Sequence, residues 1–127
     1  MGRLHENRLP GGYQDNADAV WVVFTTLPSG DDAQRLSRIV LEARLAACVN
    51  CGAASRSEYW WDGKLETAQE WTLTIKTTRG HYAALEALIA AHHPYDMPEI
   101  LALPVVAGAA SYLDWVRATC ASHPEGD

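Results

Sequence analysis

Apolar and β-branched residues follow one another almost without interruption from position 19 to position 26, as AVWVVFTT. A run of this length is typical of a strand that is covered on both faces. The next residues, PSGDDAQ, are typical of a turn and a helix cap. Apolar residues then recur at helical spacing, and charged residues stand between them. This periodicity predicts a helix over residues 31–47 that buries Leu36, Ile39, Val40, Ala43 and Ala47.

Two further segments, SRSEYWW and KLETAQEWTLTIKT, flank the dipeptide Asp62-Gly63. Asp-Gly favours the positive φ angles of a tight hairpin turn, so the two segments predict a pair of long antiparallel strands. In the second strand Trp71, Leu73 and Ile75 alternate with polar residues. One face of this strand should therefore be buried, and the other should be polar or lie at an interface.

A second helical periodicity covers residues 80–92 and ends before Pro94, because proline has no N–H to donate and disfavours the helical conformation of the residue before it. The segment PEILALPVV, residues 98–106, predicts a fourth strand, with Pro104 at an edge or near the strand's end. A last helix opens near Ser111 and places Tyr112, Trp115, Val116 and Thr119 at helical spacing.

The order of these elements is βαββαβ followed by a helix, which predicts an α+β, ferredoxin-like fold with an antiparallel sheet and helices on one face. A chain of 127 residues is long enough for one compact domain, which we place at residues 19–121. We expect residues 1–18 to be a flexible N-terminal extension and residues 122–127 to be a flexible tail.

The charge balance limits the classes of partner. Ten Lys and Arg residues against sixteen Asp and Glu residues give a net charge of −6, which argues against a nucleic-acid partner. The longest apolar runs are too short to span a membrane, so we expect no membrane partner. Three cysteines are an odd number, and the first residues do not resemble a secretory signal. We therefore expect reduced thiols and a cytoplasmic location.

The segments LEARLAACVN, YWWDGKLE, IKTT, HHPYDMPEILALPV and YLDWV occur in this order, and together they closely resemble the CutA family of divalent-cation tolerance proteins. The resemblance covers roughly residues 19 to 118. It implies a ferredoxin-like subunit that forms a tight homotrimer by joining sheet edges, with an architecture similar to that of the PII signalling proteins. It also implies a role in tolerance of copper and other divalent metals and, in animals, in anchoring acetylcholinesterase.

The adjacent histidines His92 and His93 are the candidate metal ligands, because imidazole suits copper and zinc. The structural alternative is that they end the helix, where a histidine interacts well with the helix dipole and can cap free carbonyls. The resemblance implies that in some family members this pair binds copper together with a cysteine on the first strand. Here Phe24 occupies the position that we align with that cysteine, so an inherited copper site lacks its thiolate.

A second set of polar and aromatic residues could line a cleft between subunits, where a PII-like signalling module would bind a small anion or metabolite. The alternative is structural: Lys76 and Glu70 would form interface ion pairs that fix the register, and the Trp60-Trp61 pair would pack at the subunit contact. A trimeric scaffold for partner proteins is a third interpretation. The candidate cleft residues are Trp60, Lys64, Glu66, Glu70, Lys76, Tyr95 and Glu99.

The remaining motif is Cys48-Val-Asn-Cys51, which resembles a redox or zinc site only in its spacing. It follows a helix and begins a strand, and over three extended residues the two thiols are about 10 Å apart on opposite faces, too far for a disulfide. We find no hydrolase, nucleotide-binding or metalloprotease motif. We therefore predict that the protein is not an enzyme and uses no organic cofactor. Its candidate ligand is a divalent metal ion, copper or zinc.

Overall fold

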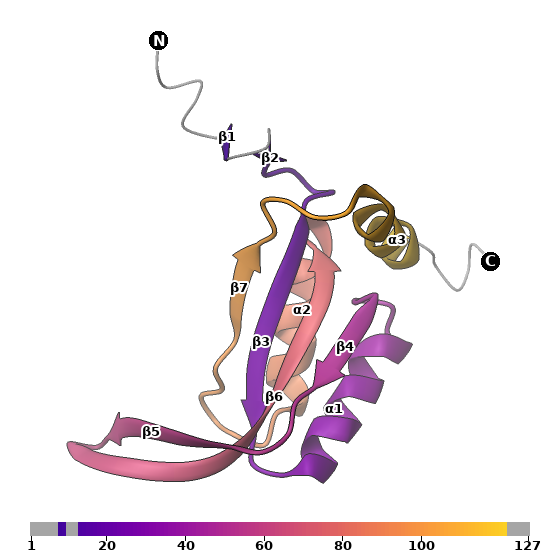
Figure 1. Cartoon of the computed structure of the whole chain (residues 1–127). Coiled ribbons are helices and arrows are strands. Elements are labelled where there is room, and N and C mark those ends of the chain that lie inside the picture. Colours follow the sequence, from indigo (N-terminus) through magenta and orange to yellow (C-terminus); the bar gives the residue numbers. More distant parts are fainter. Residues whose placement is uncertain (1–7, 10–12, 122–127) are drawn as a thin grey trace.

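The structure is a computed structural model that describes residues 8–9 and 13–121 (Figure 1). The predicted flexible tail, and residues 1–7 and 10–12 of the predicted extension, lie outside the described residues. The elements are β1 (Arg8–Leu9), β2 (Tyr13–Gln14), β3 (Val20–Leu27), α1 (Gly30–Glu42), β4 (Cys48–Cys51), β5 (Ser55–Trp61), β6 (Lys64–Thr78), α2 (Arg79–His92), β7 (Leu101–Pro104) and α3 (Ala110–Ala121).

The main sheet has the strand order β4-β6-β3-β7, and every neighbouring pair is antiparallel. The central pair is in register from Val20 opposite Thr78 to Leu27 opposite Trp71. Strands β3 and β4 are joined through α1 but separated by β6, which is the split βαβ arrangement of the ferredoxin-like fold. The predicted fold class is therefore confirmed.

Helices α1 and α2 cover one face of the sheet, as predicted. The Ser29 side chain caps α1 by accepting a hydrogen bond from the Asp32 N–H at 3.0 Å. The two helices and the sheet bury a single apolar cluster, which is formed by Val23, Leu27, Ala33, Leu36, Val40, Ala46, Leu73, Ile75, Leu85 and Ile89. Burial of these side chains is the main source of the fold's stability.

Helix α1 ends at Glu42, five residues earlier than the predicted boundary at residue 47. Arg44 has a φ of 62°, a left-handed conformation that ends a helix. The apolar pattern nevertheless continues, because Leu45 packs against the core and Ala46 is buried in the turn that follows. Apolar spacing alone therefore could not distinguish this turn from a further helical turn.

Helix α3 packs across one end of the opposite face of the sheet, where Val116 and Cys120 contact Val20 (Figure 1). The rest of that face has no helix over it among the described elements. It carries Leu101 and Leu103 of β7, each 57% exposed, paired with Phe24 and Val22. The expectation that β3 is covered on both faces is therefore wrong within one chain, because α3 reaches only its first residues.

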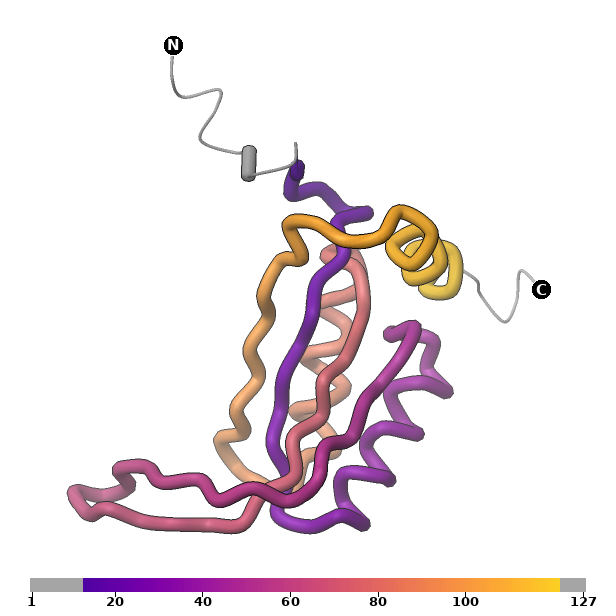
Figure 2. Tube along the Cα trace, in the orientation of Figure 1, coloured from indigo at the N-terminus to yellow at the C-terminus, as the bar shows by residue number. Residues whose placement is uncertain are grey.

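Strands β5 and the first half of β6 form an arm that projects from the body of the domain (Figure 2). Its tip is the predicted Asp62-Gly63 turn, and both residues have positive φ angles, 53° and 76°. Trp60, which is 74% exposed, and Leu65, 61% exposed, lie opposite each other on the arm. Much apolar surface of the arm is thus uncovered in the single chain.

Asp15, which lies within the predicted extension 1–18, contacts two residues of the domain. Asp15 forms an ion pair with Arg79 at 3.7 Å, and Trp21 donates a hydrogen bond to Asp15 at 3.3 Å.

Strand β7 covers only the middle of the predicted segment 98–106. No helix in the described part of the chain is long and apolar enough to cross a membrane.

Candidate functional site

The candidate metal ligands lie at the carboxyl end of α2. Helix α2 ends at His92, as predicted, and His93 is extended with φ −80° and ψ 139°. Pro94 accounts for this change, because it restricts the preceding residue to extended conformations. His92 is therefore the last helical residue and is exposed, whereas His93 leaves the helix and is half-buried.

Both ring nitrogens of His93 have partners. The Tyr95 backbone N–H donates to Nδ1 at 3.1 Å, so Nδ1 carries the lone pair and the proton is on Nε2. Nε2 then donates to the Thr26 carbonyl oxygen at 2.9 Å, and it also lies 3.1 Å from the Thr25 hydroxyl. Burial is the main influence on the pKa of His93 and lowers it.

This arrangement does not fit a metal site made by the histidine pair. A metal needs the lone pair of a neutral imidazole, and the lone pair of His93 already accepts a hydrogen bond. No group of three or more His, Cys, Asp and Glu residues in the described part of the chain could hold a metal ion. Metal contact at His92 and His93 stays a prediction, and only His92 has an exposed ring.

The strand residue beside His93 is Thr25 rather than Phe24. Side chains alternate along a strand, and Thr25 is on the same face as Val23, the face that α1 and α2 cover. Phe24 is paired with Leu101 and Thr74, and its side chain lies on the opposite face. The expectation that Phe24 stands where a strand cysteine would lie beside the histidines is therefore wrong by one residue. The strand residue beside His93 is Thr25.

A groove of about 710 Å³ lies between the base of the arm and the loop after α2. It brings together three of the seven predicted cleft residues, Glu70, Tyr95 and Glu99. The other four, Trp60, Lys64, Glu66 and Lys76, do not line it. The full lining is Thr26, Ser57, Glu58, Tyr59, Trp61, Glu70, Pro94, Tyr95, Asp96, Met97 and Glu99.

The Glu70 carboxylate accepts two side-chain hydrogen bonds at this groove. It accepts hydrogen bonds from the Tyr95 hydroxyl at 2.9 Å and from the Thr26 hydroxyl at 3.3 Å. Burial and the neighbouring Glu70 carboxylate raise the pKa of Tyr95 to about 12. Tyr95 therefore remains a neutral hydrogen-bond donor across the physiological pH range.

The groove is acidic and aromatic. Four carboxylate residues line it, Glu58, Glu70, Asp96 and Glu99, and none of the described residues in its lining is Lys, Arg or His. Tyr59, Trp61 and Tyr95 supply aromatic rings. Arg56 forms an ion pair with Glu58 at 3.0 Å, so one of the four carboxylates has a cationic partner. A small anion would still meet an excess of negative charge here, whereas a cation would find both carboxylates and ring faces.

Lys76 and Glu70 have partners within the chain. The Lys76 ammonium donates to the Asn50 side-chain oxygen on the neighbouring strand β4. Glu70 bonds Tyr95 and Thr26, as described above. The prediction that these two residues form ion pairs between subunits stays a prediction.

The three cysteines are free in the structure. Cys48 and Cys51 are the two ends of strand β4, and Cys120 is a buried residue of α3 that packs against Val20. Burial raises the pKa of the Cys120 thiol, which makes it a poor nucleophile. These thiols provide no redox pair.

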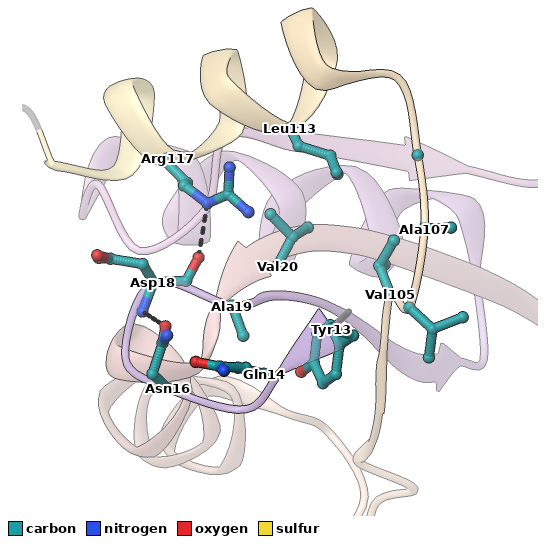
Figure 3. A pocket seen from close by; sticks show the side chains of 12 residues that line it. Tyr13, Gln14, Asn16, Asp18, Ala19, Val20, Val105, Ala107, Leu113 and Arg117 are labelled. Atoms are coloured by element: carbon teal, nitrogen blue, oxygen red, sulfur yellow. Dashed lines mark hydrogen bonds between the residues drawn. The ribbon is translucent and has the colours of Figure 1, made fainter. Parts of the chain in front are cut away.

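A second cavity, of about 570 Å³, lies between α3 and the segments before β3 and after β7 (Figure 3). Arg117 crosses it and donates from Nε to the Asp18 carbonyl oxygen at 2.9 Å. Its guanidinium also bonds Asp114 at 3.1 Å. The cavity contains no predicted site residue. The Arg117–Asp18 hydrogen bond attaches α3 to the segment before β3, whereas the Arg117–Asp114 contact lies within α3.

The fold and these motifs can be compared with known proteins. The family model for the CutA1 divalent ion tolerance protein matches residues 21–119. The chain belongs to the CutA1 family. The divalent-cation tolerance protein CutA of Pectobacterium atrosepticum is 46% identical over 102 residues, which are 80% of this chain and 92% of that protein.

Two solved structures support the same relationship. The divalent cation tolerance protein CutA1 from Thermus thermophilus has a TM-score of 0.77 and is 41% identical, over 79% of this chain and 97% of that one. CutA1 from a psychrotrophic Shewanella species has a TM-score of 0.79 and is 38% identical, over 82% and 97% of the two chains. The ferredoxin-like fold is thus shared by CutA1 relatives.

Proposed function

We propose that this protein is a cytoplasmic homotrimer that takes part in the response to divalent metal ions, copper first among them, without catalysing a reaction. The observation that carries the metal role is membership of a family whose relatives are named for divalent-cation tolerance. The free thiols of the described chain support a reducing compartment. Cell fractionation with an antibody to the protein tests the compartment.

The uncovered apolar surface supports the trimer. Leu101 and Leu103 on the open face of the sheet, and Trp60 and Leu65 on the arm, each expose more than half of their surface. Surface of this kind marks a protein interface, and a closed symmetric assembly would cover it in every copy. Light scattering coupled to size exclusion should give about three subunit masses.

A matched pair of variants tests the same assignment. Leu103→Asp places a charge on the open face of the sheet, and Ala87→Asp places the same charge on an exposed position of α2. We expect Leu103→Asp to give smaller species at micromolar concentration and Ala87→Asp to keep the trimer, because only the first charge would be buried between subunits. A wild-type monomer contradicts the proposal.

The proposed metal contact is His92, with copper(II) or zinc as the ion. Its ring is exposed at the end of α2, and a neutral imidazole is a good ligand for both metals. Calorimetric titration with copper(II) should show binding that is lost in His92→Ala. A control variant, His81→Ala, removes a histidine at the other end of α2, where it bonds Thr78, and should leave copper binding unchanged.

A second candidate function is the binding of a small organic cation in the groove at the base of the arm. The groove's four carboxylates and three aromatic rings favour it over the small anion that the sequence suggested. Spermidine can be tested as a probe against glycerol and acetate by NMR titration. Shifts at Trp61 and Glu99 with spermidine alone support this function, and equal shifts with all three probes oppose it.

A further inference from the structure

His93 lies where three segments of the chain meet: the end of α2, the end of β3 and the loop that leads to β7. Each ring nitrogen bonds a different one of the other two segments. Nδ1 accepts from the Tyr95 N–H of the loop, and Nε2 donates to the Thr26 carbonyl oxygen of β3. The imidazole thus joins the loop to the strand in a fixed orientation.

The same contacts continue into the groove. The rings of His93 and Tyr95 lie with their centroids 5.1 Å apart and their planes tilted by 37°. The Tyr95 hydroxyl donates to Glu70, and Glu70 also accepts from the Thr26 hydroxyl. His93, Tyr95, Glu70 and Thr26 therefore form a closed circuit of contacts that joins the loop to β6 and β3.

Metal binding at His93 would break this circuit. A metal at Nδ1 would displace the Tyr95 N–H, and a metal at Nε2 would displace the proton that bonds Thr26. In either case a half-buried backbone group would lose its hydrogen bond. His92 has no such constraint, because its ring is exposed.

We propose that His93 is a positioning residue of the groove, which sets Tyr95 against Glu70, and that it is not a metal ligand. The two adjacent histidines then have separate roles, and His92 alone contacts metal. This inference goes beyond the proposed metal function. It depends on the groove only in one respect, that the Tyr95–Glu70 contact which His93 positions lies there. Its own test concerns hydrogen bonds and does not depend on metal being bound.

NMR of the full-length, metal-free protein tests the role of His93 directly. Long-range ¹H–¹⁵N correlation should show the neutral tautomer with the proton on Nε2. Hydrogen exchange of the Tyr95 amide should accelerate by about tenfold or more in His93→Ala, because the amide loses its acceptor. His92→Ala is the matched control, and it should leave the Tyr95 exchange rate unchanged.

Two conservative variants separate the two ring nitrogens. His93→Asn keeps an acceptor near the position of Nδ1, so it should restore much of the Tyr95 amide protection. His93→Gln keeps a donor near the position of Nε2 but has no acceptor for the Tyr95 amide, so it should not restore the protection of that amide. These variants also replace His93→Ala if that variant fails to fold.

Copper(II) titration of the same set completes the experiment. We expect His93→Asn to bind copper within about twofold of wild type, and His92→Ala to bind at least about tenfold more weakly. A proton on Nδ1, unchanged Tyr95 exchange in His93→Ala, or copper binding lost in His93→Asn but kept in His92→Ala would each overturn the inference. If no form binds copper, the metal proposal fails, and the NMR measurements still decide the role of His93.

Discussion

Replacing Tyr95 by Phe tests the hydrogen bond at the centre of the groove. The substitution keeps the ring and removes the hydroxyl that donates to Glu70 at 2.9 Å. A hydrogen bond to a charged group contributes about 1.5–3 kcal/mol when it is shielded from water. Tyr95 and Glu70 are only half-buried, so we expect Tyr95→Phe to lower the free energy of unfolding by about 1 kcal/mol at pH 7.

The pH dependence of stability gives a second, sharper expectation. The pKa of Tyr95 rises from 10.0 to about 12 in the folded protein, mainly because of burial and then because of Glu70. The folded state thus holds this proton more tightly than the unfolded state does. The resulting stability is complete below pH 10 and is lost as the pH rises toward 12. The full linkage is roughly 2.7 kcal/mol, and solvent screening reduces it to about 1–2 kcal/mol.

Urea unfolding at pH 7, 9 and 12, at one fixed protein concentration, measures both effects. Wild type should lose about 1–2 kcal/mol more than Tyr95→Phe between pH 9 and pH 12. Tyr59→Phe is the matched control, because Tyr59 lines the same groove and is 40% exposed. If Tyr95→Phe is as stable as wild type at pH 7 and shows the same loss at high pH, the hydrogen bond to Glu70 does not hold in solution.

Three further outcomes are expected. Gly63→Ala should lower the free energy of unfolding by about 1 kcal/mol in a urea titration, because residue 63 has a φ of 76°; an unchanged midpoint would contradict the turn conformation. Thiol titration of unfolded, unreduced protein should count all three cysteines, whereas a count of one would reveal a disulfide. A thiol-reactive probe should modify Phe24→Cys faster than Thr25→Cys, each measured against wild type, because Thr25 is fully buried and Phe24 is only half-buried; the reverse order would show that the two strand faces are exchanged.

The fold could be predicted because each element has a distinct pattern of apolar residues. The alternation of Trp71, Leu73 and Ile75 specifies which side chains of β6 meet the helices, and Asp62-Gly63 specifies the turn. The end of α1 could not be predicted. A left-handed Arg44 is a conformational choice that its residue type does not reveal, and the buried residues after it imitate helical spacing.

The groove was only partly predictable, because it depends on which face of the arm points toward the loop after α2. Trp60 and Trp61 are adjacent and therefore lie on opposite faces of β5, and the groove contains Trp61. Periodicity shows the alternation but not the direction in which the arm bends. The same one-residue parity separates Phe24 from Thr25 at the histidine site. Errors of this kind arise whenever the face of a strand residue is assigned from the sequence without knowing which strands pair with it and in which register.

The different environments of His92 and His93 follow from the three residues His-His-Pro. A helix ending would keep both rings on the helix surface if the chain stayed helical through His93. Pro94 prevents this, because it confines His93 to an extended conformation, with ψ 139°. The change in backbone direction moves the second ring from the helix surface to the end of β3, where it meets Thr26, while the first ring stays exposed. Two residues that look equivalent as metal ligands in the sequence are thus separated by the proline that follows them.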